Sequence, residues 1–150
     1  MNFIVIFSQR QHFGNEANIF QFGPPPPFVG KTKDYSFDCP GVDARETAVL
    51  LFESYDVTIG RNIFQINGVE VFGGLPVGPE GEQHGNFRTS AWIGNVLLVE
   101  PRHQLRATGN ILHIESRAAT NTGSDIDDFV LDNMVIMYKT AATHPVPPLR

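Results

Sequence analysis

The dipeptide Asn67-Gly68 is the sequence feature that most constrains how this chain can fold. Asn-Gly accommodates the positive φ angles of a two-residue β-hairpin turn, and apolar runs flank it on both sides. Residues 63–66 lead into the turn and residues 69–72 lead out of it. Gly73-Gly74 then permits a sharp exit from the second run. We therefore predict a hairpin at this point, with the other strands of the chain added around it.

Apolar runs separated by glycine and proline recur along the rest of the chain. The clearest of them cover residues 46–57, 87–92, 95–99, 111–116 and 127–138. Residues 111–116 alternate between apolar and polar side chains, whereas the centre of 46–57 is apolar on both faces. No helix longer than a turn or two and no internal repeat is expected. Many short strands at roughly even spacing predict an all-β fold, an antiparallel jelly-roll β-sandwich.

The first 40 residues differ in composition from the rest of the chain. They hold seven of the 12 phenylalanines and the run Pro24-Pro25-Pro26-Pro27, which favours an extended polyproline segment. We expect residues 1–40 to form an N-terminal Phe/Pro-rich arm that packs either on the sandwich or on a neighbouring subunit. The sandwich itself is expected over residues 41–140, and residues 141–150 form a proline-rich tail.

Composition limits the partners that this protein can bind and the cellular compartments in which we expect it. The formal net charge is −5 and basic residues form no run, which argues against nucleic acid and against anionic membranes as partners. The single cysteine, Cys39, excludes an internal disulfide and a multi-cysteine zinc site. Residues 1–7 are apolar but too short for a membrane span and lack the features of a signal peptide. We expect a protein that is cytoplasmic or exported without an N-terminal signal.

Three segments together resemble the galactose-binding-like jelly-roll superfamily, which includes carbohydrate-binding modules and accessory domains of glycosidases. They are Ile66-Asn67-Gly68, the stretch from Leu105 through Gly109-Asn110 to Ile114, and Asp128 to Ile136. The resemblance covers about residues 42–140. It implies a jelly-roll fold and, in many members, sugar binding at loop ends with a structural calcium. Since these motifs consist mainly of turn and core residues, they are more specific for fold than for function.

The densest acidic cluster is a candidate calcium site, because carboxylates in a loop offer the hard oxygen ligands that calcium prefers. Its members are Asp125, Asp127, Asp128 and Asp132. In the resembling modules, an acid of the closing strand is a calcium ligand, and Asp132 lies at that place. Asp38, Asp43 or Glu46 is the candidate partner from an earlier strand. The alternative is that these aspartates make turn and capping hydrogen bonds at the start of a strand.

Trp92, the only tryptophan, is the candidate platform for a sugar ring. Polar side chains near it in sequence would read the hydroxyl groups; they are His84, Asn86, Arg88 and Asn95. The alternative places Trp92 in the core, since a sandwich of this size commonly buries its tryptophan.

Catalytic motifs are weak throughout the chain. The five histidines form no H-x-H or H-E-x-x-H pattern, and there is no G-x-S-x-G motif. We therefore predict a non-catalytic, lectin-like protein that binds a carbohydrate or glycoconjugate and gains avidity as a homo-oligomer. The alternative is a structural subunit of a capsid, fibre or injection machine, in which the N-terminal segment makes subunit contacts.

Overall fold

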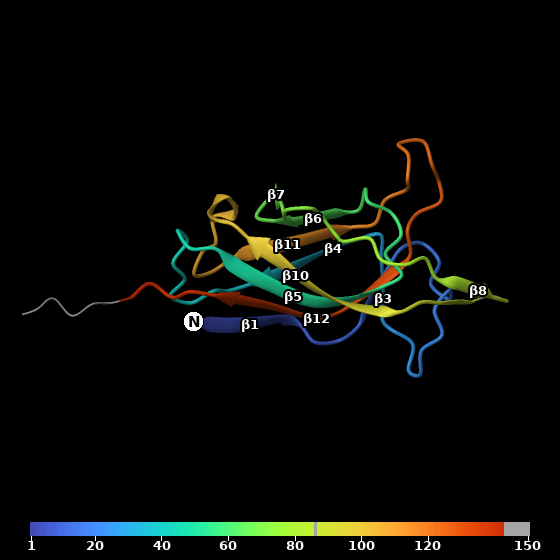
Figure 1. Cartoon of the computed structure of the whole chain (residues 1–150), viewed down its shortest axis with the longest axis horizontal. Helices are drawn as coiled ribbons and strands as arrows, with labels where there is room; N and C mark the ends of the chain where they lie inside the picture. The colour runs from blue at the N-terminus through green and yellow to red at the C-terminus, as the bar shows by residue number, and fades with distance from the viewer. Residues whose placement is uncertain (86, 143–150) are drawn as a thin grey trace, which may run out of the picture.

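Two β-sheets face each other in the computed structural model, which describes residues 1–85 and 87–142 (Figure 1). The larger sheet has the strand order β10-β5-β12-β2-β3, and β1 also pairs with β12. These strands are β1 (Asn2–Phe7), β2 (Gln11–Phe13), β3 (Phe28–Gly30), β5 (Ala48–Tyr55), β10 (Trp92–Val99) and β12 (Phe129–Tyr138). All pairs in it are antiparallel except β2 with β3.

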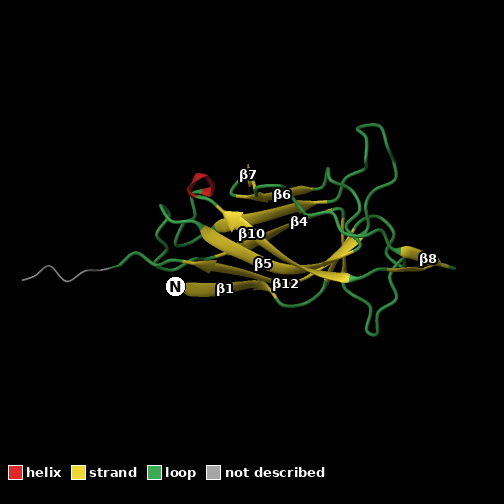
Figure 2. Cartoon of the chain, viewed as in Figure 1, coloured by secondary structure: helices red, strands yellow, loops and turns green. Residues whose placement is uncertain are grey.

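The second sheet has four strands in the order β4-β11-β6-β7. They are β4 (Thr32–Phe37), β6 (Ile63–Ile66), β7 (Val69–Glu70) and β11 (Asn110–Glu115). Strands β8 (Glu82–His84) and β9 (Phe87–Thr89) form a separate hairpin, and one short 3-10 helix, η1 (Pro101–His103), follows β10 (Figure 2). The predicted all-β sandwich is confirmed. The jelly-roll connectivity stays a prediction.

The core lies between the two sheets because their strands alternate inward and outward side chains. Leu112 and Ile114 of β11 are fully buried against Leu50 of β5 and Ile136 of β12 in one apolar cluster. Strands β5 and β12 run through the middle of the larger sheet and have neighbours on both sides. The long apolar runs of the sequence therefore become its central strands.

The predicted hairpin is present, but it lies at an edge. Asn67 and Gly68 have φ angles of 51° and 79°, and Ile66 pairs with Val69 across the turn. Strand β7 is short and ends the four-stranded sheet. The sheets are thus organised around the β5–β12 pair rather than around this turn, because a two-residue loop fixes only the pairing of its own two strands.

Residues 1–40, expected as an arm, contribute strands to both sheets. Strand β1 lies along the end of β12, β2 lies along its start, and β4 pairs with β11. Phe13 has no exposed surface and stacks on Phe129, with 5.3 Å between the ring centroids. The structure therefore places this segment inside the sandwich of its own chain. A change in composition near residue 40 does not mark a change in architecture.

Within the tail expected at 141–150, residues 143–150 lie outside the described residues. No helix in the described part of the chain is both long and apolar enough to cross a membrane.

Candidate functional site

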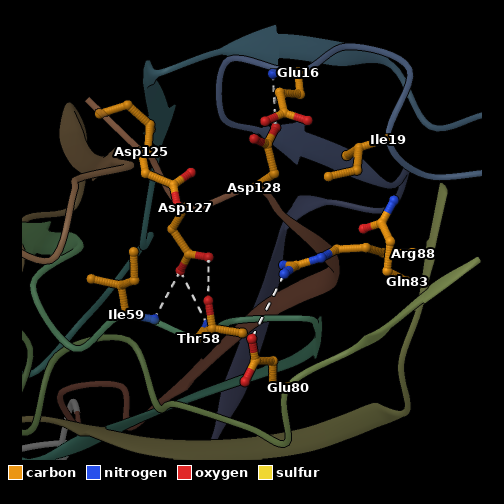
Figure 3. A pocket seen from close by; sticks show the side chains of 11 residues that line it. Glu16, Ile19, Thr58, Ile59, Glu80, Gln83, Arg88, Asp125, Asp127 and Asp128 are labelled. Carbon is orange, nitrogen blue, oxygen red and sulfur yellow. Dashed lines mark hydrogen bonds and ion pairs between the residues drawn. The ribbon is translucent and has the colours of Figure 1, made fainter. Parts of the chain in front are cut away.

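A polar pocket of about 390 Å³ lies at one end of the sandwich, where four loops meet (Figure 3). It is lined by the loops after β2 and β5, by the segment before β12, and by residues in and just before the β8–β9 hairpin; they are Glu16, Ile19, Thr58, Ile59, Glu80, Gln83, Arg88, Asp125, Ile126, Asp127 and Asp128. Three of the four predicted calcium ligands and one predicted sugar contact, Arg88, therefore meet in one pocket. No local pattern in the sequence indicates that these two sets of residues converge.

Asp127 anchors the floor of the pocket. Its carboxylate accepts hydrogen bonds from the backbone N–H of Thr58 and of Ile59, each at 3.1 Å, and from the Thr58 hydroxyl at 2.9 Å. Asn62 Nδ2 donates a fourth bond at 2.8 Å. Burial raises the pKa of Asp127 above the usual carboxyl value, and the hydrogen bonds act in the opposite direction. This carboxylate ties the loop after β5 to the start of β12.

Asp128 makes the corresponding link to the loop after β2. Its Oδ1 lies 2.9 Å from Nε2 of the buried His12 and accepts the backbone N–H of Glu16 at 3.1 Å. Gly14 lies so close that a Cβ there would be 1.9 Å from the same oxygen, and its φ is +140°. Only glycine permits this approach. Glu16 is consequently held at the rim of the pocket.

Arg88 is positioned by the buried carboxylate of Asp56. The side chain of Asp56 has no exposed surface, and it lies 3.4 Å from Arg88 Nη1. It also accepts the backbone N–H of Gly81 at 2.7 Å. Burial raises the pKa of Asp56 above its usual range, while Gly81 and Arg88 lower it. These contacts fasten the β8–β9 hairpin to the end of β5.

The groups that remain open to a ligand are polar and sit above this framework. Arg88 is 26% exposed at its side chain and lies 3.7 Å from Glu80 Oε1 (Figure 3). Glu16, Gln83 and Asp125 are exposed around it. Half-buried isoleucines supply the apolar part of the wall; they are Ile19, Ile59 and Ile126. A guanidinium, an amide and carboxylates beside aliphatic groups suit a small polyhydroxylated ligand.

Trp92 does not line this pocket. It is half-buried on the outer face of the larger sheet, in an aromatic cluster with Phe22 and Tyr55. The guanidinium carbon of Arg10 lies 4.9 Å from the Trp92 ring centroid and 4.8 Å from that of Phe22. Because its own chain packs on the ring, the geometry favours the predicted alternative, a packing role for Trp92.

The other predicted sugar contacts are separated from one another. His84 lies on β8 with its side chain 51% exposed, 3.6 Å from Glu82. Asn95 is buried in β10 and donates to the hydroxyl of Ser54 at 2.9 Å. Asn86 lies outside the described residues. Of the described members of that set, the structure brings only Arg88 to the pocket.

The four aspartates do not form a calcium site as a group. Asp132 belongs to a different cavity, where it lies 3.5 Å from Arg10. Both oxygens of Asp127 and Oδ1 of Asp128 are engaged by protein groups, as described above. The candidate partners are also paired: Asp38 with the Gly109 N–H, Asp43 with Arg45, and Glu46 with Lys139. Among the described residues, no three His, Cys, Asp or Glu side chains are placed to hold a metal ion. These positions do not favour a calcium ion at the four aspartates, and the calcium site stays a prediction.

Sequence reasoning missed most of the residues that build the pocket, among them Thr58, Asn62 and Glu16. Each lies just outside a strand, where polar residues are common and carry no distinctive pattern. The one usable indication is Asp127-Asp128, two acids directly before an apolar strand. Burial of both was not expected from the sequence.

Comparisons with protein-family models, with curated proteins and with solved structures give no match to this chain. Functional inference therefore depends on the geometry described above.

Proposed function

We propose that this protein is a non-catalytic, lectin-like binder whose loop-end pocket takes a small carbohydrate or the terminal sugar of a glycoconjugate. The observation that carries the proposal is Arg88, held by buried Asp56 and directed into a polar pocket of about 390 Å³. A fixed guanidinium can donate two hydrogen bonds to neighbouring hydroxyls. Gln83 and the exposed carboxylates would complete hydroxyl recognition, and Ile19, Ile59 and Ile126 would face the CH groups of the ring.

Rigidity of the framework supports binding by this pocket. Asp127 and Asp128 fix the surrounding loops by hydrogen bonds, so little conformational entropy is lost when a ligand enters. A single pocket of this size predicts weak affinity, which a multivalent glycan would raise. Calcium is a further proposal from the resemblance, and the donor geometry does not favour it at the four aspartates.

The test is a glycan array of the intact protein, run once with calcium and once with a chelator. We expect binding to a related set of sugars. Arg88→Ala and the exposed Gln83→Ala should each weaken it about tenfold or more, whereas Arg102→Ala, at the other end of the sandwich, should not. A blank array under both conditions would reject the proposal. If both pocket variants still bind the sugars, the binding site lies elsewhere on the protein. If the wild-type protein loses binding only in the presence of chelator, this would support a metal ion at the site.

An assembly subunit is the second candidate function. The observation that favours it is the outer face of the larger sheet, where large apolar side chains remain exposed on strands at both of its sides. Phe3 of β1 is 61% exposed and Val96 of β10 is 66% exposed. Exposed apolar patches of this kind mark interaction surfaces. The measurement that tests this candidate is particle mass against concentration.

A further inference from the structure

The outer face of the larger sheet carries two apolar rows that cross four strands. The first row follows the register Phe3–Met137–Val49–Leu98, and the second follows Val5–Val135–Leu51–Val96. Side chains two residues apart point to the same side of a sheet, so all eight share one face. We call these eight residues the apolar outer face. It crosses β1, β12, β5 and β10, which lie in that order in Figure 1.

These eight side chains point away from the core of the sandwich. Their sequence neighbours Leu50 and Ile136 are fully buried between the sheets. The four side chains on the flanking strands β1 and β10 are exposed: Phe3 is 61% exposed, Val5 49%, Val96 66% and Leu98 51%. The four on the central strands β5 and β12 are half-buried. Together the four exposed side chains present on the order of 400 Å² of apolar surface, which is at the level of patches that mark interaction sites.

The sequence of the central strands is that of strands buried on both sides. Val49-Leu50-Leu51-Phe52, Val96-Leu97-Leu98-Val99 and Met134-Val135-Ile136-Met137 are continuous apolar runs. Strands with one solvated face alternate apolar and polar residues, whereas strands covered on both faces read as continuous apolar runs. One side of these runs is covered by the four-stranded sheet. The other side lacks a cover within the described residues.

Further along the same face, the chain does cover its own apolar residues. Val130, Tyr55 and Trp92 form the next apolar row, and Phe20 and Phe22 pack over it. Val130 is consequently fully buried and Tyr55 is 6% exposed. The loop that carries Phe20 and Phe22 therefore covers one half of this side of the sheet and leaves the apolar outer face open.

We infer that a second copy of this chain covers the apolar outer face, in a two-fold dimer in which the two larger sheets pack face to face. Sheets that pack in this way keep their strands within about 30° of each other and interdigitate their side chains. A two-fold interface uses the same patch on both partners, so an entirely apolar patch is matched by itself. The inference adds to the second candidate function and is independent of sugar binding.

Charges at the border of the face also fit a second copy. Lys139, paired with Glu46 at 3.0 Å, lies beyond the first row. Glu53 and Asp132 lie beyond the second, where Asp132 is 3.5 Å from Arg10. When the strands of two copies run antiparallel, the Lys139 end of each copy meets the Glu53 end of the other. An apolar centre with a polar rim is the usual composition of an interface of about 800 Å² per partner.

Sedimentation velocity from about 1 to 100 μM tests the dimer, since this range covers micromolar dissociation constants. We expect the intact protein to reach twice the 16.6 kDa chain mass. Val96→Glu, on the apolar outer face, should raise the dimer dissociation constant at least about 100-fold, because it buries an unpaired charge. Val77→Glu is the matched control, since Val77 is 53% exposed in a loop outside that face. Thermal unfolding should confirm that both variants fold.

Three outcomes would overturn the inference. A protein that stays at 16.6 kDa up to 100 μM has no such dimer. A dimer that Val96→Glu leaves unchanged uses another surface. Mass that grows without limit indicates open-ended assembly, which supports the second candidate function but contradicts a closed dimer. Removing residues 143–150 provides a further check, because a dimer that forms only after this removal would identify the tail as the occupant of the face.

Discussion

Asn67 and Asn110, which are 43 residues apart in sequence, join their side chains through a hydrogen bond of 3.0 Å from Asn67 Nδ2 to Asn110 Oδ1. Asn67 is the first residue of the β6–β7 turn, and Asn110 begins β11. Asn67 Oδ1 in turn accepts the backbone N–H of Ile111 at 3.0 Å. Together the two bonds tie the β6–β7 turn to the start of β11.

Asn110→Ala should lower the free energy of unfolding by about 3 kcal/mol, because several buried groups would lose their partners. The Asn110 amide has no exposed surface and donates to the Phe37 and Arg106 carbonyl oxygens at 3.2 and 2.7 Å. Urea unfolding measures the effect, with the exposed Asn18→Ala as control. Equal stability of the two variants would contradict a structural role for the Asn67–Asn110 pair.

The fold class followed from the sequence because strands and turns leave local patterns. The Asn67-Gly68 turn, the alternation of residues 111–116 and the apolar run of β12 each depend on neighbouring residues alone. The place of residues 1–40 did not follow, since pairing of β1 with β12 joins residues more than 125 positions apart, such as Phe3 and Met137. No local pattern encodes such a partner.

The candidate site could be predicted from the sequence less well than the fold could. Arg88 and Asp127 were both singled out, but for different sites, because their shared pocket depends on loops converging from distant parts of the chain. The sequence alone leaves both a platform role and a core role open for Trp92. Its actual neighbours, Phe22 and Arg10, come from the N-terminal segment whose place could not be foreseen.

Asp127→Ala should destabilise the protein by about 2–3 kcal/mol, because it removes both acceptor oxygens of the carboxylate. The backbone N–H groups of Thr58 and Ile59 and the amide of Asn62, which all donate to Oδ2, would lose their acceptor. Asp125→Ala, an exposed change in the same pocket, is the control and should alter stability by less than about 0.5 kcal/mol. Chemical denaturation compares them. If the two substitutions cost the same, the anchoring role of Asp127 is wrong.

Two phenylalanines of the N-terminal segment test whether it is part of the core. Phe13→Ala should cost about 3–5 kcal/mol, since Phe13 has no exposed surface and stacks on Phe129. Phe3→Ala should cost less than about 1 kcal/mol at sub-micromolar concentration, because Phe3 is 61% exposed. Thermal unfolding followed by circular dichroism distinguishes them. Small effects at both positions would indicate that the segment is an appendage.

Trp92→Ala should lower stability by about 2 kcal/mol and leave ligand binding at the Arg88 pocket unchanged. The substitution removes ring contacts with Phe22 and Tyr55 and a cation–π contact with Arg10. Trp92→Phe, which keeps an aromatic ring, should recover most of the stability. The measurement is unfolding together with binding of any sugar found on the array. Loss of binding in a fully stable Trp92→Ala variant would return Trp92 to the role of a platform.

Asp56 should make stability depend on pH in a defined direction. Burial raises the pKa of Asp56 in the folded protein above its ordinary value of 3.8, so the native state holds this proton more tightly than the unfolded state does. The free energy of unfolding therefore falls as pH rises between the two pKa values, by up to about 1.4 kcal/mol per pH unit.

Asp56→Asn removes this titration, so the difference in the free energy of unfolding between wild type and variant should narrow as pH rises between the two pKa values of Asp56. Urea unfolding at a series of pH values from 4 to 8 measures the gap, with the exposed Glu53→Gln as control. A gap that stays constant with pH would show that the folded and unfolded states hold the Asp56 proton equally.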